Sequence, residues 1–443
     1  ATLNDAPSPE PSSGIVVCDL GDVTDTSGNV TGWAYTPLPS GVAVAVDPER
    51  GRVAFAGDLS KPPLVTFHYG FSANVGGGEY DRTSSIDTGV GKVFRVANTF
   101  AATQGTVPTI QAALNALGLD EGAAIAGGLQ DDKGRAVEII DNGRYEELEQ
   151  SGVKQPLKLS TARRLELRAG DKRRPTLALT KEVEISGDEN SEVSLNGLLM
   201  SGAGLHVKSR LRLLRLSHCT IIAGAADQRG PNHAPALVVD WADVEIEIDD
   251  CIILGGLRIS PDASVRVRNS IIDSTSELGV AYAAPGTAIK AGGSLRVENS
   301  TVVGKVFTTV LELASNSIFL ARLRPSDGPL WRGPVQAEQR QKGCARFSYL
   351  PPSSRVPRRY RCQPEAGADE TRIRPTFSSL RYGDPDYCQL SSRCPRELGR
   401  GADDESEMGV FHNLFQPQRE SHLRARLDEY LRFGLEAGIL YAS

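Results

Sequence analysis

Long apolar runs are missing from this sequence. No segment approaches the roughly 20 consecutive apolar residues that an α-helix needs to cross a bilayer, so we expect no membrane span. Residues 1–14 are polar and rich in proline, and they lack the apolar centre of a secretion signal. The chain does not begin with methionine, which indicates that it is processed or is a piece of something longer, so a signal could have been removed.

Positive charge, aromatic rings and common catalytic motifs are also scarce. The formal net charge of −6 argues against a general nucleic-acid binder. Aromatic residues make up 6% of the chain, a low figure for a carbohydrate-degrading groove, which normally presents several stacking rings. The six histidines lack the spacing of zinc enzymes, and neither a Gly-x-Ser-x-Gly elbow nor a P-loop is present. We therefore expect no nucleic-acid partner and no cofactor, and the case for an enzyme is weak.

What the sequence does contain is an internal repeat. Each copy is a strand of alternating apolar and charged residues, a polar pair and a second apolar strand, so one face of the first strand points inward. The copies cover residues 214–222, 246–254, 265–273, 295–303 and, with one extra residue, 311–319. Their spacing is uneven while the motif is constant. This favours a β-helix with loops of different length over leucine-rich repeats, whose period is stricter.

A polar pair marks the bend in each copy. The second members of these pairs are Cys219, Cys251, Ser270, Ser300 and Ser317. An asparagine at such a bend can stack on an asparagine of the next coil, because buried amides satisfy one another. We predict this ladder for Asn269 and Asn299. We interpret the thiols of Cys18, Cys219 and Cys251 as buried small hydrophobes.

A short amphipathic helix is predicted ahead of the repeats. Residues 109–117 follow a proline and end before Gly118, as helices commonly do. The apolar side chains on one face are those of Ile110, Ala113, Leu114 and Leu117. Because the first coil of a solenoid has an exposed apolar end, we expect this helix to cover it. The helix, the next strand and the turn at 142–147 resemble the opening of pectate-lyase-like β-helices.

These patterns predict a mainly β fold with a right-handed parallel β-helix at its centre. The expected parts are a small β-rich region at 1–95, a capping helix and connection at 96–130, the β-helix at 131–325 and an irregular region at 326–443. The last part ends in an amphipathic α-helix. The apolar stripe of this helix consists of Leu423, Leu427, Tyr430 and Leu431.

The C-terminal region contains four cysteines and little apolar content. They are Cys344, Cys362, Cys388 and Cys394, and their spacing does not match the knuckles of zinc sites. Two disulfides, 344–362 and 388–394, would stabilise a region with little core, while free thiols and metal binding stay open as alternatives. We also expect residues 325–364 to pack back along the β-helix and to cover one of its faces.

A few carboxylates are candidates for chemistry, because β-helix enzymes cut acidic polysaccharides with clustered carboxylates, often holding calcium, and with Arg or Lys as the base. The candidate catalytic residues are Asp240, Asp249, Asp250 and Lys290, with Asp243 and Arg258 as further members. Asp249 and Asp250 occupy a turn that Arg268 and Asn269 fill in the next copy, which favours turn formation over catalysis. Calcium is expected only if the chain is such an enzyme.

Four longer segments resemble a known family. Residues 67–81, 346–362, 380–388 and 407–420 are similar to bacterial right-handed β-helix repeat proteins of phage-tail-like, contractile-injection gene clusters. The similarity runs from about residue 40 to the end, and members are generally longer, so this chain resembles a C-terminal portion. The resemblance implies a structural or surface-binding component of a tail-like particle, and it provides no catalytic residues.

Two functions follow from these observations. The first is a non-enzymatic β-helix component of a phage-tail-like particle or secreted assembly, which binds a protein partner or a surface glycan outside the cell. The alternative is a polysaccharide lyase or glycoside hydrolase, as in phage tailspikes. A trimeric fibre piece overlaps both, although no heptads signal a trimer. The sequence leaves the ligand, the oligomeric state and what precedes Ala1 open.

Overall fold

The structure is a computed structural model, and it divides into two compact units, residues 1–70 and 71–441. It describes residues 14–18, 20–25, 29–47, 52–57, 73–97, 106–126, 134–146, 149–150, 153–224, 233–286, 289–365, 372–384, 386–391 and 393–415, together with 422, 423, 425, 426, 429 and 430.

The first unit is β-rich. In one sheet, β4 (Val44–Asp47) pairs in parallel with β1 (Ile15–Val17) and in antiparallel with β5 (Arg52–Phe55). A second pair joins β2 (Asp22–Thr24) and β3 (Val30–Trp33) in antiparallel. The core of this unit consists of Cys18, Leu20, Ala45 and Ala54, with Trp33, Tyr35 and Leu38 packed against it.

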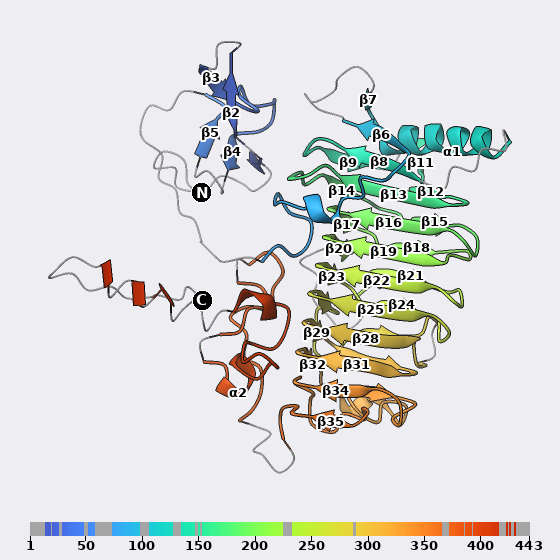
Figure 1. The fold of residues 1–443 in the computed structure, drawn as a ribbon, viewed down its shortest axis with the longest axis vertical. Coiled ribbons are helices and arrows are strands. Elements are labelled where there is room, and N and C mark those ends of the chain that lie inside the picture. Colours follow the sequence, from blue (N-terminus) through green and yellow to red (C-terminus); the bar gives the residue numbers. More distant parts are fainter. Residues whose placement is uncertain are drawn as a thin grey trace. The chain divides into compact units, whose positions relative to one another are not determined.

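The second unit is a right-handed parallel β-helix whose strands stack in order along the long axis of Figure 1. Its first sheet has twelve strands, in the spatial order β7 (Thr106–Val107), β6 (Lys92–Val96), β8 (Arg135–Ile139), β13 (Arg164–Ala169), β16 (Glu192–Asn196), β19 (Leu213–Ser217), β22 (Glu245–Asp249), β25 (Ser264–Arg268), β28 (Ser294–Glu298), β31 (Leu311–Ser315), β34 (Cys344–Arg346) and β35 (Arg359–Tyr360).

Two eight-stranded sheets complete the walls. The second sheet has the order β9 (Arg144–Glu146), β14 (Thr176–Ala178), β17 (Leu199–Gly202), β20 (Thr220–Ala223), β23 (Ile252–Leu254), β26 (Ile271–Asp273), β29 (Thr301–Val303) and β32 (Ile318–Leu320). The third has the order β12 (Lys158–Ser160), β15 (Val183–Ser186), β18 (Leu205–Val207), β21 (Leu237–Val239), β24 (Leu257–Ile259), β27 (Val280–Ala283), β30 (Lys305–Thr308) and β33 (Val335–Ala337). A small antiparallel pair, β10 (Glu149–Gln150) and β11 (Val153–Lys154), lies between β9 and β12 in the chain.

Alternation along each strand explains why these residues form coils. In β22, Ile246 and Ile248 are fully buried, while Glu245 and Glu247, which alternate with them, face outward. The same register aligns Ile248 with Val267 in the next coil. Inward aliphatic side chains of all three sheets therefore join one continuous core, as the repeat predicts.

The solenoid extends beyond the expected segment 131–325 at both ends. β6 and β7 join it before that segment, and β33, β34 and β35 join it afterwards. Residues 325–364 thus form further coils, and the expectation that they pack back along a face is wrong. The physical reason is that this segment, although rich in proline and arginine, still places inward residues in the main core, including Val335, Ala345 and Leu350.

Helix α1 (Ile110–Ala126) lies at the N-terminal end of the solenoid, where Figure 1 shows it across the first coils. It is longer than the predicted 109–117. It contacts β6, β7, β8 and β12. The four apolar side chains of its predicted stripe are buried in the main core, so this part of the expectation is confirmed.

Two segments run along the outside of the solenoid at the bends between the first and second sheets. The N-terminal strap, residues 73–89, includes η2 (Thr83–Ser85), and the C-terminal strap, residues 372–415, includes α2 (Arg396–Gly399) and η4 (His412–Leu414). Figure 1 shows both beside the second sheet. The straps share one apolar cluster over Ile271, to which Val75 and Phe411 contribute. A second cluster packs Leu398 and Met408 on Ile318.

The end of the chain is described only in part. The six described residues between 422 and 430 are helical and exposed, with the Tyr430 side chain among the most open. Leu427 and Leu431 of the predicted apolar stripe lie outside the described residues. None of the helices in the described part combines the length and apolar character that a bilayer crossing requires.

Candidate functional site

A ladder of left-handed residues marks the bend after each of the last eight strands of the first sheet, from β16 to β35. Successive coils place a residue with φ between 47° and 73° here, and these are Gly197, His218, Asp250, Asn269, Asn299, Asn316, Phe347 and Arg361. Asparagine and aspartate tolerate this conformation better than other side chains with a β-carbon, which explains their frequency at the bend. We call this row the bend ladder.

The predicted asparagine stack is confirmed and is longer than expected. The Asn299 amide donates to Asn269 Oδ1 at 3.3 Å, and the Asn316 amide donates to Asn299 Oδ1 at 3.3 Å. The C-terminal strap joins both ends of the stack, because Asn413 donates to Asn269 at 2.9 Å and Asn316 donates to Asp403 at 2.8 Å.

A second ladder lies beneath the first, at the buried residue after each bend. The Cys251 N–H donates to Ser270 Oγ at 2.9 Å, and the Ser270 N–H donates to Ser300 Oγ at 3.1 Å. The Ser270 hydroxyl donates in turn to the Arg268 carbonyl at 2.6 Å. Cys219 and Cys251 are buried as predicted, but their thiols are members of this ladder, since the Cys219 N–H points to Cys251 Sγ at 3.4 Å. The interpretation as simple hydrophobes was therefore incomplete.

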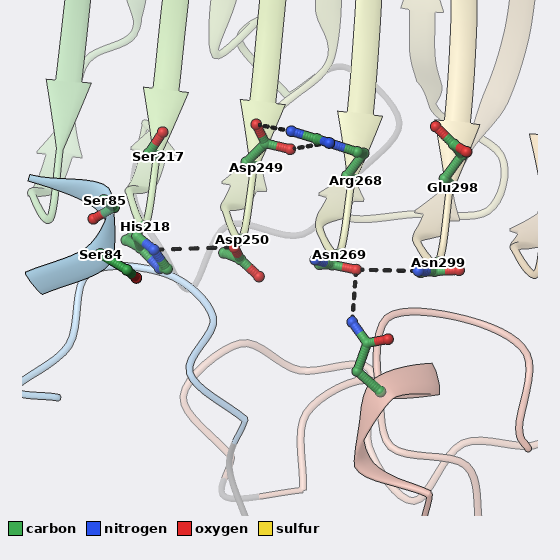
Figure 2. A pocket seen from close by; sticks show the side chains of 11 residues that line it. Ser84, Ser85, Ser217, His218, Asp249, Asp250, Arg268, Asn269, Glu298 and Asn299 are labelled. Atoms are coloured by element: carbon green, nitrogen blue, oxygen red, sulfur yellow. Dashed lines mark hydrogen bonds and ion pairs between the residues drawn. The ribbon is translucent and has the colours of Figure 1, made fainter. Parts of the chain in front are cut away.

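The bend ladder forms one wall of an open groove of about 490 Å³ between the two straps. Figure 2 shows the side chains that line it, from the strap residues Ser84 and Ser85 to the ladder residues of four successive coils. The complete lining is Ser84, Ser85, Ser217, His218, Asp249, Asp250, Arg268, Asn269, Glu298, Asn299 and Asn413. We call this pocket the bend groove.

Ion pairs fix most charges in the bend groove. Arg268 donates to both oxygens of Asp249, at 2.6 and 2.9 Å, as Figure 2 shows. Arg296 donates to both oxygens of Glu298, at 2.8 and 3.1 Å. The hydrogen bonds from Arg296 lower the pKa of Glu298, so this carboxylate is ionised at neutral pH.

His218 and Asp250 differ from these paired groups. Burial lowers the pKa of His218 to about 4, and the nearby Arg82 guanidinium adds to the effect, so the imidazole is neutral at pH 7. Its Nδ1 lies 3.1 Å from the Tyr80 hydroxyl. Burial, together with the charge of Asp249, raises the pKa of Asp250 to about 6. The Asp250 carboxylate lies 4.0 Å from His218 Nε2, beyond hydrogen-bond distance.

The structure brings together two of the four candidate catalytic residues. Asp249 and Asp250 line the bend groove. Asp240 follows β21 of the third sheet and contacts His206 Nε2 at 2.7 Å, and Lys290 is exposed in the loop before β28. Neither Asp240 nor Lys290 lines the groove.

The two further members of that set have local roles. Asp243 has a φ of 59° in the turn before β22. Arg258 donates to the Leu257 and Val280 carbonyls at 3.1 and 3.2 Å. Among the described residues no disulfide joins any of the cysteines, so neither predicted pair, 344–362 nor 388–394, is bonded.

Several groove residues were not predicted from the sequence. His218 and Arg268 could have been found, because the repeat aligns them with Asp250 and Asp249. Ser84, Ser85 and Asn413 carry no such signal, since the straps have no repeat. No protein-family model matches this chain, and no curated protein has a similar sequence.

Proposed function

We propose that this chain is a non-enzymatic, surface-binding β-helix component of a phage-tail-like particle or secreted assembly. The observation that carries the proposal is the mutual fixation of polar groups in the bend groove. Asp249 is held by Arg268, and Asn269 is held between Asn299 and Asn413. Groups fixed in this way offer donors and acceptors to a ligand without the entropy cost of ordering them on binding.

The charge state of the groove favours a hydroxyl-rich ligand such as a surface glycan. The carboxylates of Asp249 and Glu298 are compensated by arginines, and His218 is neutral at pH 7. The remaining lining offers hydroxyls and amides from Ser84, Ser85 and the asparagines of the bend ladder. Such groups can exchange hydrogen bonds with sugar hydroxyls, and the Asp250 carboxylate, with a pKa of about 6, is mostly ionised at pH 7 and adds a further acceptor.

A second candidate is a glycoside hydrolase or polysaccharide lyase with Asp250 as its acid. A pKa of about 6 suits proton donation near neutral pH. A hydrolase also needs a second carboxylate roughly 5–10 Å away that can act as nucleophile or base. Both carboxylate oxygens of the neighbouring Asp249 already accept hydrogen bonds from Arg268, so neither is free to attack a sugar or to take up a proton, which argues against this alternative.

The proposal is tested with the purified chain and a panel of acidic and neutral polysaccharides. Binding is measured by glycan array, and turnover is followed by ultraviolet absorbance and reducing ends, with and without calcium. Asp250→Asn keeps the left-handed bend and is expected to weaken glycan binding, while Asp240→Asn, outside the groove, serves as the control. Turnover of any polymer that Asp250→Asn abolishes would replace the proposal by the enzyme alternative.

A further inference from the structure

We propose that the C-terminal strap binds a divalent transition-metal ion such as Zn²⁺ through Asp403, Asp404 and His412. One ligand atom from each of these residues lies within 4.8 Å of the other two. The cluster is separate from the lining of the bend groove, so this inference does not depend on the function proposed above.

The orientation of His412 points to a cation. Its side chain is 8% exposed, and its Nδ1 lies 2.7 Å from Ser406 Oγ and 3.2 Å from the Glu407 carbonyl. A histidine that donates from Nδ1 to a backbone carbonyl presents a lone pair on Nε2, as metal-binding histidines do. This Nε2 lies 3.6 Å from Asp404 Oδ2 and has no hydrogen bond among the described residues. Two such groups facing each other need a proton or a metal ion between them, and a divalent ion would be bound by both groups at once.

The two aspartates are each fixed through one oxygen. Asp404 Oδ1 accepts the Ser406 N–H at 3.0 Å, and Asp403 Oδ1 accepts the Asn316 amide at 2.8 Å. Bonds of about 2.0–2.2 Å in the tetrahedral geometry of Zn²⁺ place its nitrogen and oxygen ligand atoms about 3.3–3.6 Å from one another. Both aspartates are exposed, so small side-chain rotations bring the present separation into that range. Three protein ligands leave a further position for water.

A serine-hydrolase triad is the competing explanation of these residues, since His412 contacts Ser406 through Nδ1 and Asp404 through Nε2. Ser406 is fully buried, however, and no substrate can reach its hydroxyl. A bound ion would instead attach the strap to the bend ladder, because Asp403 exchanges two hydrogen bonds with Asn316, at 2.8 and 3.1 Å. The ion therefore acts as a structural clamp.

The test is a titration of the full chain, freed of metal with a chelator, with Zn²⁺ by calorimetry and with Co²⁺ by absorption. We expect one site in the unmodified chain and an affinity at least about tenfold lower in Asp404→Asn and in His412→Gln. Glu405→Gln, an exposed acid beside the cluster, is the matched control and should bind as the unmodified chain does.

Circular dichroism establishes that each variant folds, and Asp403→Asn provides a further variant that retains an acceptor for Asn316. The proposal is overturned if the unmodified chain binds no Zn²⁺, or if Asp404→Asn and His412→Gln bind it unchanged. A thiolate-to-Co²⁺ charge-transfer band would place the ion at cysteines and overturn it as well.

Discussion

Gly76 packs so closely on Thr220 that a β-carbon at this glycine would lie 2.5 Å from the threonine hydroxyl oxygen. The next residue, Gly77, donates its N–H to the same oxygen at 2.9 Å. The C-terminal strap makes the same kind of contact in a later coil of the solenoid, at Thr301. There a β-carbon on Gly409 would lie 2.8 Å from Thr301 Oγ1, and the Val410 N–H donates to that oxygen at 3.1 Å. Both straps thus bind the bend in the same way.

This shared contact predicts that the two glycines cannot be replaced. Gly76→Ala or Gly409→Ala adds a clash to a positive φ and should lower the free energy of unfolding by about 2 kcal/mol or more. Gly383→Ala is the matched control, because it has a φ of +96° with nothing within 4 Å and pays only the backbone strain. Denaturant unfolding gives the stabilities, and limited proteolysis shows whether a strap detaches. Equal effects at all three glycines would refute the role of the clash.

The buried hydroxyl ladder predicts that two similar substitutions differ in their effect on stability. Ser270→Ala removes the acceptor of the Cys251 N–H and leaves it unsatisfied, which should cost about 1–3 kcal/mol of stability. Cys251→Ser keeps a donor and acceptor in place and should be nearly neutral. Thermal and denaturant unfolding of both variants, compared with the unmodified chain, provide the measurement. A cost for Cys251→Ser as large as that for Ser270→Ala would favour packing over hydrogen bonding.

Asp250 predicts a stability difference that grows with pH. Its folded-state pKa of about 6 lies above its ordinary value of 3.8, so the native state binds this proton more tightly than the unfolded chain does. The resulting stabilisation is complete below about pH 4 and is lost as the pH rises through 6. The side chain in Asp250→Asn does not ionise, so this variant keeps its stability as the pH rises, and asparagine suits the left-handed bend. The variant should be more stable than the unmodified chain at about pH 8 and equal to it below about pH 4.

His218 predicts the reverse dependence on pH. Its folded-state pKa of about 4 lies below its ordinary value of 6.5, so the neutral imidazole stabilises the native state above about pH 6.5. That stabilisation is lost as the pH falls towards 4, because the unfolded chain takes up the proton first. As the pH falls from about 6 to 4, His218→Asn should therefore gain stability relative to the unmodified chain. A constant difference between the two chains across this range would contradict the prediction.

The solenoid could be predicted from the sequence because its signal is local. Alternation such as Ile246, Glu247, Ile248 follows directly from one buried and one exposed face, and Asn269 and Asn299 recur where the backbone needs a positive φ. The last coils escaped prediction because β34 and β35 have three and two residues, too few to display alternation. The groove could be predicted only on its ladder side, because strap residues such as Asn413 reach it through contacts between distant parts of the chain.

The C-terminal strap changes how the solenoid can come apart. In a stack where each coil touches only its neighbours, the last coil can fray at little cost and the loss propagates one coil at a time. Here the strap spans from Asn269 to Tyr349, with further contacts to Asp273, Thr301 and Asn316 between them. No coil along this stretch can open without loosening the strap that holds the others. We therefore expect the C-terminal half of the solenoid to unfold as one cooperative unit, as a globular domain does.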